Sequence, residues 1–597
     1  MKLSGSGGSA ASLILRVVFF VVLLSLAVVH VKLVFRGLSS SHGMEHASLA
    51  REVARGNGLQ SKVLKPAAIR LNQKKTDARG TLADASLNTY HSPLYPLLLG
   101  AVFRGVEADN FDKWRMGTNE YIYELDRVVT TFSIICFFLA IGVVYLLLSR
   151  IFDGKIAGAT AILMMLCELF WDMSMSGLPQ MLMLLLFSSA CYFAYRAFEA
   201  TYEGRITIVH ALLAAIFFSL LCLTHWLAVW IALGYAIAAA IFIRPRGVAG
   251  LIALIILAGS LVYPILQNLK GTGNVGGVAL LVIYEGLAGS EEYAMRSLGE
   301  IGLNLRDLLI QLIRSTIAQT EDLYSYFGAI AAAPIFFISL FHSFKRPAIA
   351  SFRWAILIMW ISASLGMAFF GLKENELDPN QLHLLFAPLM AGYGLAMLSV
   401  LWARLDLPAT VPFLTSAHLM IVILVSSTPF LLRLPKDALD ILSGTKSEQP
   451  NYPPYAPSIL DEKLADFIGP NEIVASDQPW AVAWYADRTA LWLPLRLSEL
   501  EEIENMAESE ETPIVAVLTS PISSGTRPLV ESSRYYNDYL SLMLDGWAAV
   551  ATRTANPRIV SNQDRKLKRF FSRYPHQEIL SFRTSPLILY TSRRPGT

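Results

Sequence analysis

The chain has 597 residues, of which 54% are hydrophobic and 16% are charged. Soluble domains carry roughly 25% charged residues, and the mean hydropathy here is +0.47, so the sequence predicts an integral membrane protein. The 49 basic and 47 acidic residues nearly cancel and form no long run of one sign, which argues against nucleic acid as a partner. The cysteines all lie in apolar runs, which excludes a disulfide framework of the secreted type: Cys136, Cys167, Cys191 and Cys222.

Charge is unevenly distributed along the chain. The first 432 residues contain 57 charged side chains, whereas the last 165 contain 39, a share typical of a soluble domain. We therefore expect a membrane domain over 1–432, a Pro-rich linker over 433–458 and a soluble domain over 459–597.

Eleven apolar runs are candidates for crossing about 30 Å of hydrocarbon. They lie at 13–36, 127–149, 156–173, 177–198, 206–223, 225–243, 248–268, 327–343, 352–371, 382–404 and 411–432. A further apolar stretch, 93–103, is short and begins with prolines, so we interpret it as re-entrant or interfacial. The predicted fold class is an α-helical polytopic membrane protein with about 11 transmembrane helices and a C-terminal soluble α/β domain.

Basic residues in short loops predict the orientation, because they resist translocation. With a cytoplasmic N-terminus, the short outer loops hold only Lys373, and the inner loops and their flanks hold ten basic residues: Arg150, Lys155, Arg196, Arg205, Arg244, Arg246, Lys345, Arg346, Arg353 and Arg404. The external loops 37–126 and 269–326 and the C-terminal domain then share the extracytoplasmic side of a plasma (inner) membrane.

Smaller elements follow from periodicity. Residues 301–318 separate polar from leucine-rich faces, which predicts an interfacial helix. In the tail, 472–477, 489–494, 513–519 and 578–591 are typical of strands, and 497–509 and 534–547 of helices.

Ionisable residues gather toward the outer ends of the predicted spans, whereas transporters usually place them at mid-membrane. This favours an enzyme acting at the outer surface. A membrane transporter or a non-catalytic scaffold of cell-envelope assembly remains the alternative. A phosphoethanolamine-type transferase would need a metal-bound Thr or Ser nucleophile in the soluble domain. The tail shows no His/Asp cluster for such a site.

Four segments carry a family resemblance: MEHASLAREVARGNGL (44–59), YHSPLYPLLLGAVFRG (90–105), SGLPQMLMLLLFSSACYFAYRA (176–197) and LDPNQLHLLFAPLMAGYG (377–394). With them, residues 1–432 resemble the membrane glycosyltransferases of the GT-C fold that use polyprenyl-phosphate sugars, such as protein O-mannosyltransferases and the aminoarabinose transferases of lipid A. The resemblance implies an inverting-type sugar transfer from a polyprenyl-phosphate donor to a lipid, glycan or protein acceptor among membrane lipids at the outer face.

The resemblance also implies site residues. A carboxylate in the first external loop acts as general base in that family, and Glu45 is the nearest match, although His42 and Gly43 stand where family members usually have acids. Asp172 matches a second acid that orients the acceptor or a metal. Arg51 and Arg55 are suited to the donor phosphate, and His91 and His383 are grouped with them as donor-phosphate ligands.

Ordinary structural roles compete with each of these assignments. Glu45 can be a solvated acid at a helix N-terminus, Asp172 can reach for headgroup water, and the two arginines can rest on anionic headgroups. The histidines show no metal-ligand spacing, so no metal residues are assigned, and a divalent metal is kept only as an option. The aromatic segment 477–494 is expected to be core rather than a sugar platform.

Overall fold

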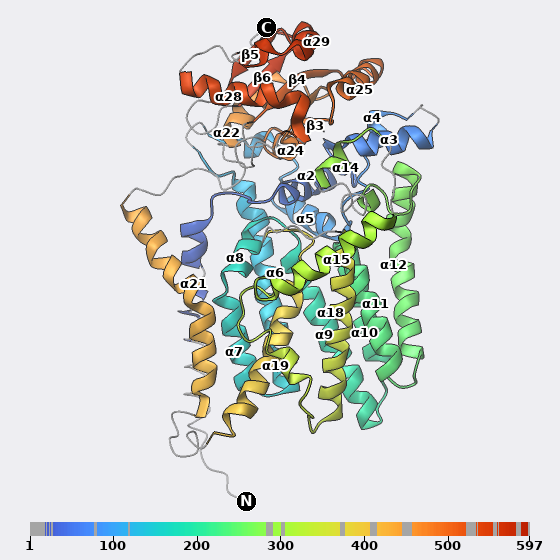
Figure 1. The fold of residues 1–597 in the computed structure, drawn as a ribbon, viewed down its shortest axis with the longest axis vertical. Coiled ribbons are helices and arrows are strands. Elements are labelled where there is room, and N and C mark those ends of the chain that lie inside the picture. Colours follow the sequence, from blue (N-terminus) through green and yellow to red (C-terminus); the bar gives the residue numbers. More distant parts are fainter. Residues whose placement is uncertain are drawn as a thin grey trace, which may run out of the picture.

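The computed structural model describes residues 18, 21–22, 24–25, 28–76, 80–117, 120–281, 291–299, 305–370, 377–405, 415–443, 457–520, 533, 535–552, 558, 560–580 and 587–594. A long helical bundle carries a smaller α/β domain at one end (Figure 1). This arrangement confirms a polytopic membrane protein with a C-terminal α/β domain.

Six helices in the described residues are long and apolar enough to cross a membrane. They are α6 (Glu124–Ile151), α9 (Gln180–Glu203), α12 (Val248–Thr272), α18 (Pro347–Phe370), α19 (His383–Trp402) and α21 (Ala417–Leu442). A seventh span is α7 (Gly154–Met165) with α8 (Glu168–Met175), bent by 55°. Shorter apolar helices are α10 (Ile208–Thr224) and α11 (Ala228–Phe242).

The predicted spanning helix at 327–343 is wrong. This segment contains turns and the four-residue helix α17 (Phe336–Ser339), and α16 (Leu323–Tyr326) precedes it. The segment packs on α19, with Phe327, Ile330 and Phe336 fully buried. Irregular backbone is tolerated at membrane depth where protein rather than lipid surrounds it. The predicted first span, 13–36, lies largely outside the described residues, so that span stays a prediction.

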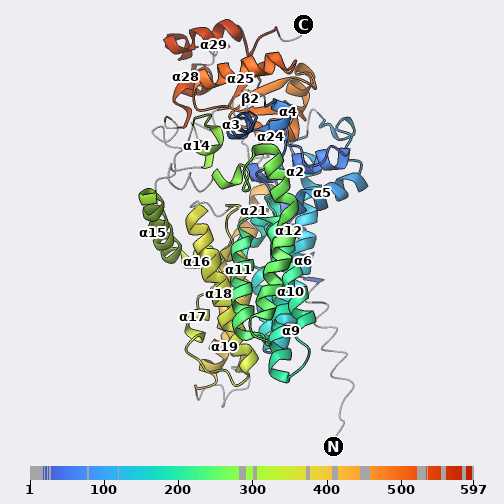
Figure 2. The same ribbon diagram turned by 90° about the vertical axis from the view of Figure 1, so that its right-hand side faces the viewer.

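The external segments form small helices at the end of the bundle that carries the α/β domain (Figures 1 and 2). They are α2 (Ser41–Arg55), α3 (Pro66–Lys75), α4 (Leu82–Ala85), α5 (Leu94–Gly105), η1 (Asp112–Trp114), η2 (Ala279–Leu281) and α14 (Glu291–Arg296). The short apolar helix α5 packs on α2. That this end faces outward stays a prediction.

The predicted amphipathic helix is α15 (Leu305–Glu321), which packs on α18. It lies at the side of the bundle (Figure 2). Its exposed apolar stripe consists of Leu305, Leu309, Ile313 and Ile317, and a stripe of this kind suits contact with lipid.

The α/β domain contains a six-stranded sheet in the order β1-β3-β2-β4-β6-β5. The strands are β1 (Val63–Leu64), β2 (Ile473–Ser476), β3 (Thr489–Trp492), β4 (Ile514–Thr519), β5 (His576–Ile579) and β6 (Ile588–Thr591). The pairs β1–β3, β3–β2 and β2–β4 are parallel, whereas β4–β6 and β6–β5 are antiparallel. The predicted tail strands are thus confirmed, whereas β1, which comes from the first external loop, was not predicted.

Alternation along the strands gives the sheet two buried faces. Leu64 and Leu491 belong to the core beneath α25 (Leu497–Ser509), α28 (Leu540–Thr552) and α29 (Lys568–Arg573). Val63, Ala490 and Trp492 belong to the core shared with the membrane domain. Remaining short elements are α22 (Pro457–Ile459), η4 (Leu460–Leu464), α23 (Ala465–Phe467), α24 (Pro479–Tyr485), η5 (Asn537–Tyr539), η6 (Ser561–Gln563) and η7 (Arg565–Leu567).

Aromatic residues of α24 join the soluble domain to the membrane domain. Trp484 and Tyr485 are fully buried, and both donate hydrogen bonds to Asp126 at the start of α6, at 2.7 and 3.1 Å. Trp480 and Trp492 are 7% exposed. The prediction that this aromatic segment is core is confirmed.

Candidate functional site

Helix α2 begins at a close contact between two backbones. A Cβ at Gly43 would collide with the carbonyl oxygen of Ser176 and lie 3.0 Å from Cα of Gly177. Because only glycine fits there, the first turn of α2 lies directly against the loop after α8. The first two turns of α2 carry His42, Glu45 and His46, and the last two of these residues are 5% and 3% exposed.

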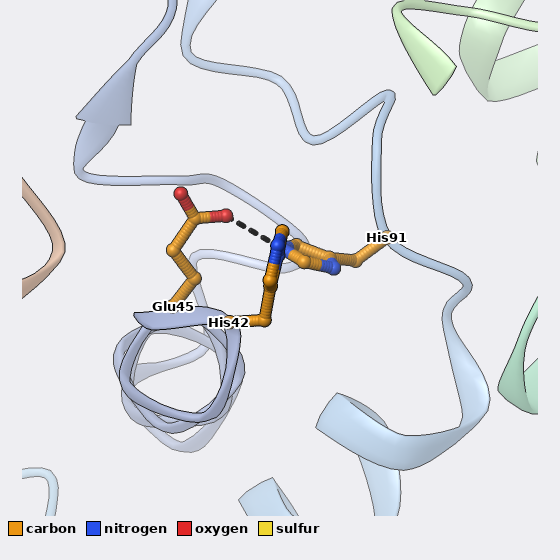
Figure 3. A group of neighbouring side chains, drawn as sticks. All are labelled: His42, Glu45 and His91. Carbon is orange, nitrogen blue, oxygen red and sulfur yellow. Dashed lines mark hydrogen bonds and ion pairs between the residues drawn. The ribbon is translucent and has the colours of Figure 1, made fainter. Parts of the chain in front are cut away.

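Glu45 is the centre of a buried polar cluster, which we call the Glu45 cluster: His42, Glu45, Lys65 and His91. Oε2 of Glu45 lies 2.5 Å from Nε2 of His91 (Figure 3). The ammonium of Lys65 lies 3.0 and 2.8 Å from Oε1 and Oε2. The cluster thus joins α2 to the residue after β1 and to the loop before α5.

A side-chain turn fixes the backbone of His91. Asn88 donates a hydrogen bond from Nδ2 to the carbonyl oxygen of His91 and accepts one at Oδ1 from its N–H, at 2.8 and 3.0 Å. The ring of His46 lies 4.1 Å from the ring of His91. In the drawn view the second ring nitrogen of His91 points away from the Glu45 carboxylate (Figure 3).

Charge in the cluster sets the protonation states. Burial alone would raise the pKa of Glu45, but Lys65 and then His91 outweigh it and hold the pKa well below its ordinary value. Burial lowers the pKa of His91 to about 4 despite its contact with Glu45. Glu45 is therefore ionised and His91 neutral at pH 7.

Three members of the cluster also form a candidate metal centre. One ligand atom each from His42, Glu45 and His91 lies within 4.8 Å of the others. Two imidazoles and one carboxylate are a donor set that zinc accepts in catalytic sites. Lys65 contacts both carboxylate oxygens, so a cation bound there would have to displace or share that contact. Beside the cluster, Nδ1 of His46 is buried and has no hydrogen-bond partner among the described residues.

A cavity of about 230 Å³ opens beside His91. The loop 89–93, α10, α11, α12 and η2 enclose it, and most of its lining is apolar, including Trp226, Leu261, Pro264, Ile265 and Phe370. Glu45, Asp172 and His383 do not line it. Of the site residues expected from the sequence, His91 is the one that lines this cavity.

Asp172 lies on α8, one turn before the Ser176–Gly177 contact with α2, and is half-buried. The structure thus brings the end of α8 against the start of α2. It does not make Asp172 a member of the three-residue group at Glu45.

Arg51 and Arg55 are held by the soluble domain instead of facing a phosphate site. Arg55 pairs with both carboxylate oxygens of Asp487, at 2.9 and 2.7 Å, and Arg51 contacts Oδ1 at 3.4 Å. Arg51 is only 1% exposed and lies over the ring of Trp484 at 4.2 Å. A buried counter-charge thus pairs with both arginines, and their donor-phosphate role stays a prediction.

His383 is also committed to protein partners. Its Nδ1 accepts a hydrogen bond from Trp360 Nε1 at 2.9 Å, and its Nε2 lies 3.0 Å from Oε1 of Gln319. The side chain is fully buried. With both ring nitrogens engaged, His383 links α15, α18 and α19, and its phosphate-binding role stays a prediction.

Sequence reasoning missed Lys65 and Asp487. Lys65 lies 20 residues from Glu45, and Asp487 lies 436 residues from Arg51. Neither belongs to a motif; the pairing of β1 with β3 and the packing of α24 on α2 bring them to this region.

No protein-family model and no curated protein matches this chain. Solved structures do. The oligosaccharyltransferase of Archaeoglobus fulgidus, in complex with zinc and sulfate, matches with a TM-score of 0.51 at 15% identity, over 88% of this chain and 71% of that chain. AglB from the same organism, with an inhibitory peptide and a dolichol-phosphate, gives 0.51 at 14% identity over 88% and 72%. Apo ArnT from Cupriavidus metallidurans gives 0.47 at 12% identity over 97% and 99%. The fold is that of the GT-C membrane glycosyltransferases.

Proposed function

We propose that this protein transfers a sugar from a polyprenyl-phosphate donor to an acceptor at the outer face of the membrane, with Glu45 as general base. One observation carries the proposal: an apolar cavity between membrane helices opens beside the buried, charged Glu45 cluster. A lipid phosphate has the matching chemistry, because its chain prefers hydrocarbon and its head requires polar partners.

The reaction needs a base for the acceptor hydroxyl. Its oxygen attacks the anomeric carbon while the bond from that carbon to the phosphate oxygen breaks. The polyprenyl phosphate leaves with the bonding electrons, and the hydroxyl proton passes to a carboxylate oxygen of Glu45. An ionised Glu45 can accept it, because the hydroxyl becomes acidic in the transition state. Attack opposite the leaving phosphate inverts the anomeric centre.

Asp172 has a supporting role in this proposal. It lies on the helix that abuts the first turn of α2, where a carboxylate can accept a hydrogen bond from the acceptor. His91 borders both the cavity and Glu45, and it holds the donor head. The acceptor is a lipid, glycan or protein that reaches the external segments.

A divalent metal is a second component that the donor set accommodates. His42, Glu45 and His91 would hold it, and it would supply Lewis-acid stabilisation of the phosphate. Metal content of the purified protein tests this, since Glu45→Gln with His42→Ala should abolish any stoichiometric zinc. Zinc retained in that double variant would contradict the assignment.

Photocrosslinking tests the donor class. A polyprenyl phosphate with a diazirine near its phosphate should label peptides 222–229 and 261–280 of the full-length protein in vesicles. Excess unlabelled polyprenyl phosphate should compete, and polyprenol should compete less. Labelling confined to other helices, or equal competition by both lipids, would contradict the proposal and favour a transporter or scaffold.

A further inference from the structure

The two-residue strand β1 ties the first external loop to the soluble domain. Val63 pairs with Ala490 and Leu64 with Leu491 in a parallel register. Lys65 directly follows Leu64, the last paired residue of this strand. Lys65 is also the N-cap residue of α3, and its carbonyl oxygen accepts from Ala68 N–H at 2.8 Å. The backbone of Lys65 is therefore fixed from both sides.

Ion pairs hold this short strand at each end. Before it, Lys62 donates to the carbonyl oxygen and to Oδ1 of Asp487, at 3.0 and 2.7 Å. After it, Lys65 pairs with Glu45. The soluble domain thus positions one ammonium group inside the Glu45 cluster.

That ammonium does not line the cavity itself but lies next to residues that do. Lys65 Nζ lies 4.7 Å from the ring centre of Tyr90, and Tyr90 and His91 both line the cavity. Arg51 and Arg55 are committed to Asp487. Lys65 is 6% exposed. An ammonium has three donors, and within the described part of the chain its contacts with Glu45 use two of them.

We infer that Lys65 binds the phosphate of the polyprenyl-phosphate donor and of the departing polyprenyl phosphate. The inference rests on the proposed function and names the residue that recognises its leaving group. The third N–H of Lys65 meets a phosphate oxygen while the ammonium keeps contact with Glu45.

The charge of the phosphate changes during transfer. The donor is a phosphodiester with one negative charge, whereas the released monoester carries between about 1.5 and 2 negative charges at pH 7. A fixed ammonium therefore interacts more strongly with the departing phosphate than with the bound donor. Interactions that strengthen toward the transition state raise kcat. Lys65 thus stabilises the leaving group rather than merely retaining substrate.

The test compares the affinities of the full-length protein in detergent for polyprenyl phosphate and for polyprenol, measured by native mass spectrometry. The ratio isolates recognition of the phosphate, because a general packing defect weakens both lipids. Lys65→Met should weaken the binding of polyprenyl phosphate at least tenfold, since a hydrogen bond to a charged group is lost. The affinity for polyprenol should stay unchanged. Lys65→Arg should retain most of the preference for polyprenyl phosphate over polyprenol.

Lys62→Met is the matched control, because it removes an ammonium from the other end of the same strand. Its ratio should stay within about threefold of wild type, since the lost contact is with Asp487. If Lys65→Met does not fold, as judged by thermal unfolding, Lys65→Gln supplies the neutral variant.

Each result has one reading. A wild-type protein that binds both lipids equally contradicts the proposed function itself. A wild-type preference for phosphate that Lys65→Met retains overturns the assignment of Lys65 alone. An equal loss in Lys62→Met also overturns it, because the effect would then come from a disturbed sheet.

Discussion

Replacing Asp487 by asparagine tests how the soluble domain is attached. Asp487 has a φ of 53°, in the left-handed region that asparagine tolerates well. The change therefore removes the charge while keeping shape and backbone preference. Burial would raise the pKa of Asp487, but Arg51 and Arg55 hold it well below its ordinary value, so the charge is present at neutral pH.

The size of the effect follows from what each cation retains. Arg55 keeps Glu52 at 2.6 Å, and Lys62 keeps it at 3.5 Å; both cations are about one-fifth exposed. In the part of the chain that the structure describes, Arg51 keeps only neutral acceptors, the Trp484 carbonyl and the Tyr123 hydroxyl, both at 3.0 Å. Leaving a buried charge unpaired costs about 3–5 kcal/mol. For Asp487→Asn we expect the lower end of this range, about 3 kcal/mol, because the asparagine carbonyl still accepts a hydrogen bond.

Hydrogen exchange measures this cost locally. A loss of about 3 kcal/mol lowers amide protection in α24 and the last turns of α2 by roughly a hundredfold. Asp466→Asn is the control, because Asp466 lies in the same domain as Asp487, is 63% exposed and pairs with Arg115 of the first external loop; it should cost less than about 1 kcal/mol. Protection in Asp487→Asn within fivefold of wild type would refute the reasoning.

Three other perturbations test the site and the topology. Gly43→Ala should destabilise the protein by about 1–3 kcal/mol in thermal unfolding through overpacking, whereas Gly142→Ala, with open space around it, should not; equal effects would contradict the close contact at α2. Asp172→Asn should lower transfer less than Glu45→Gln does, and a larger loss would make Asp172 the base. A cysteine at Glu508 should react with an impermeant maleimide from outside intact cells, without background from the buried native cysteines; labelling only after lysis would reverse the orientation.

The bundle and most tail strands could be predicted because hydrophobic runs and alternation are local signals. The exception at 327–343 is instructive. Its composition suits a helix, but the surrounding protein buries Phe327, Ile330 and Phe336, so turns are tolerated there where lipid would exclude them. Composition along the chain does not reveal whether lipid or protein surrounds a segment.

The site was predictable only in part. Glu45 and His91 stand in recognisable segments, and the structure brings them together. The spacing of Arg51 and Arg55 suggested a phosphate clamp, yet Asp487 pairs with both. A basic helical face looks the same in sequence whether a phosphate or a distant carboxylate neutralises it. Strand β1, with two residues, is too short to carry an alternating pattern, so Lys65 had no sequence signal.

The release of polyprenyl phosphate tests the central claim most directly. Purified protein in vesicles is given a panel of polyprenyl-phosphate hexoses and pentoses with membrane extract as acceptor, and free polyprenyl phosphate is quantified. The wild type should release it from at least one donor, and Glu45→Gln should be slower by roughly 10²–10⁴-fold, as loss of a general base predicts, while still binding polyprenyl phosphate. Equal release by both proteins would contradict the account.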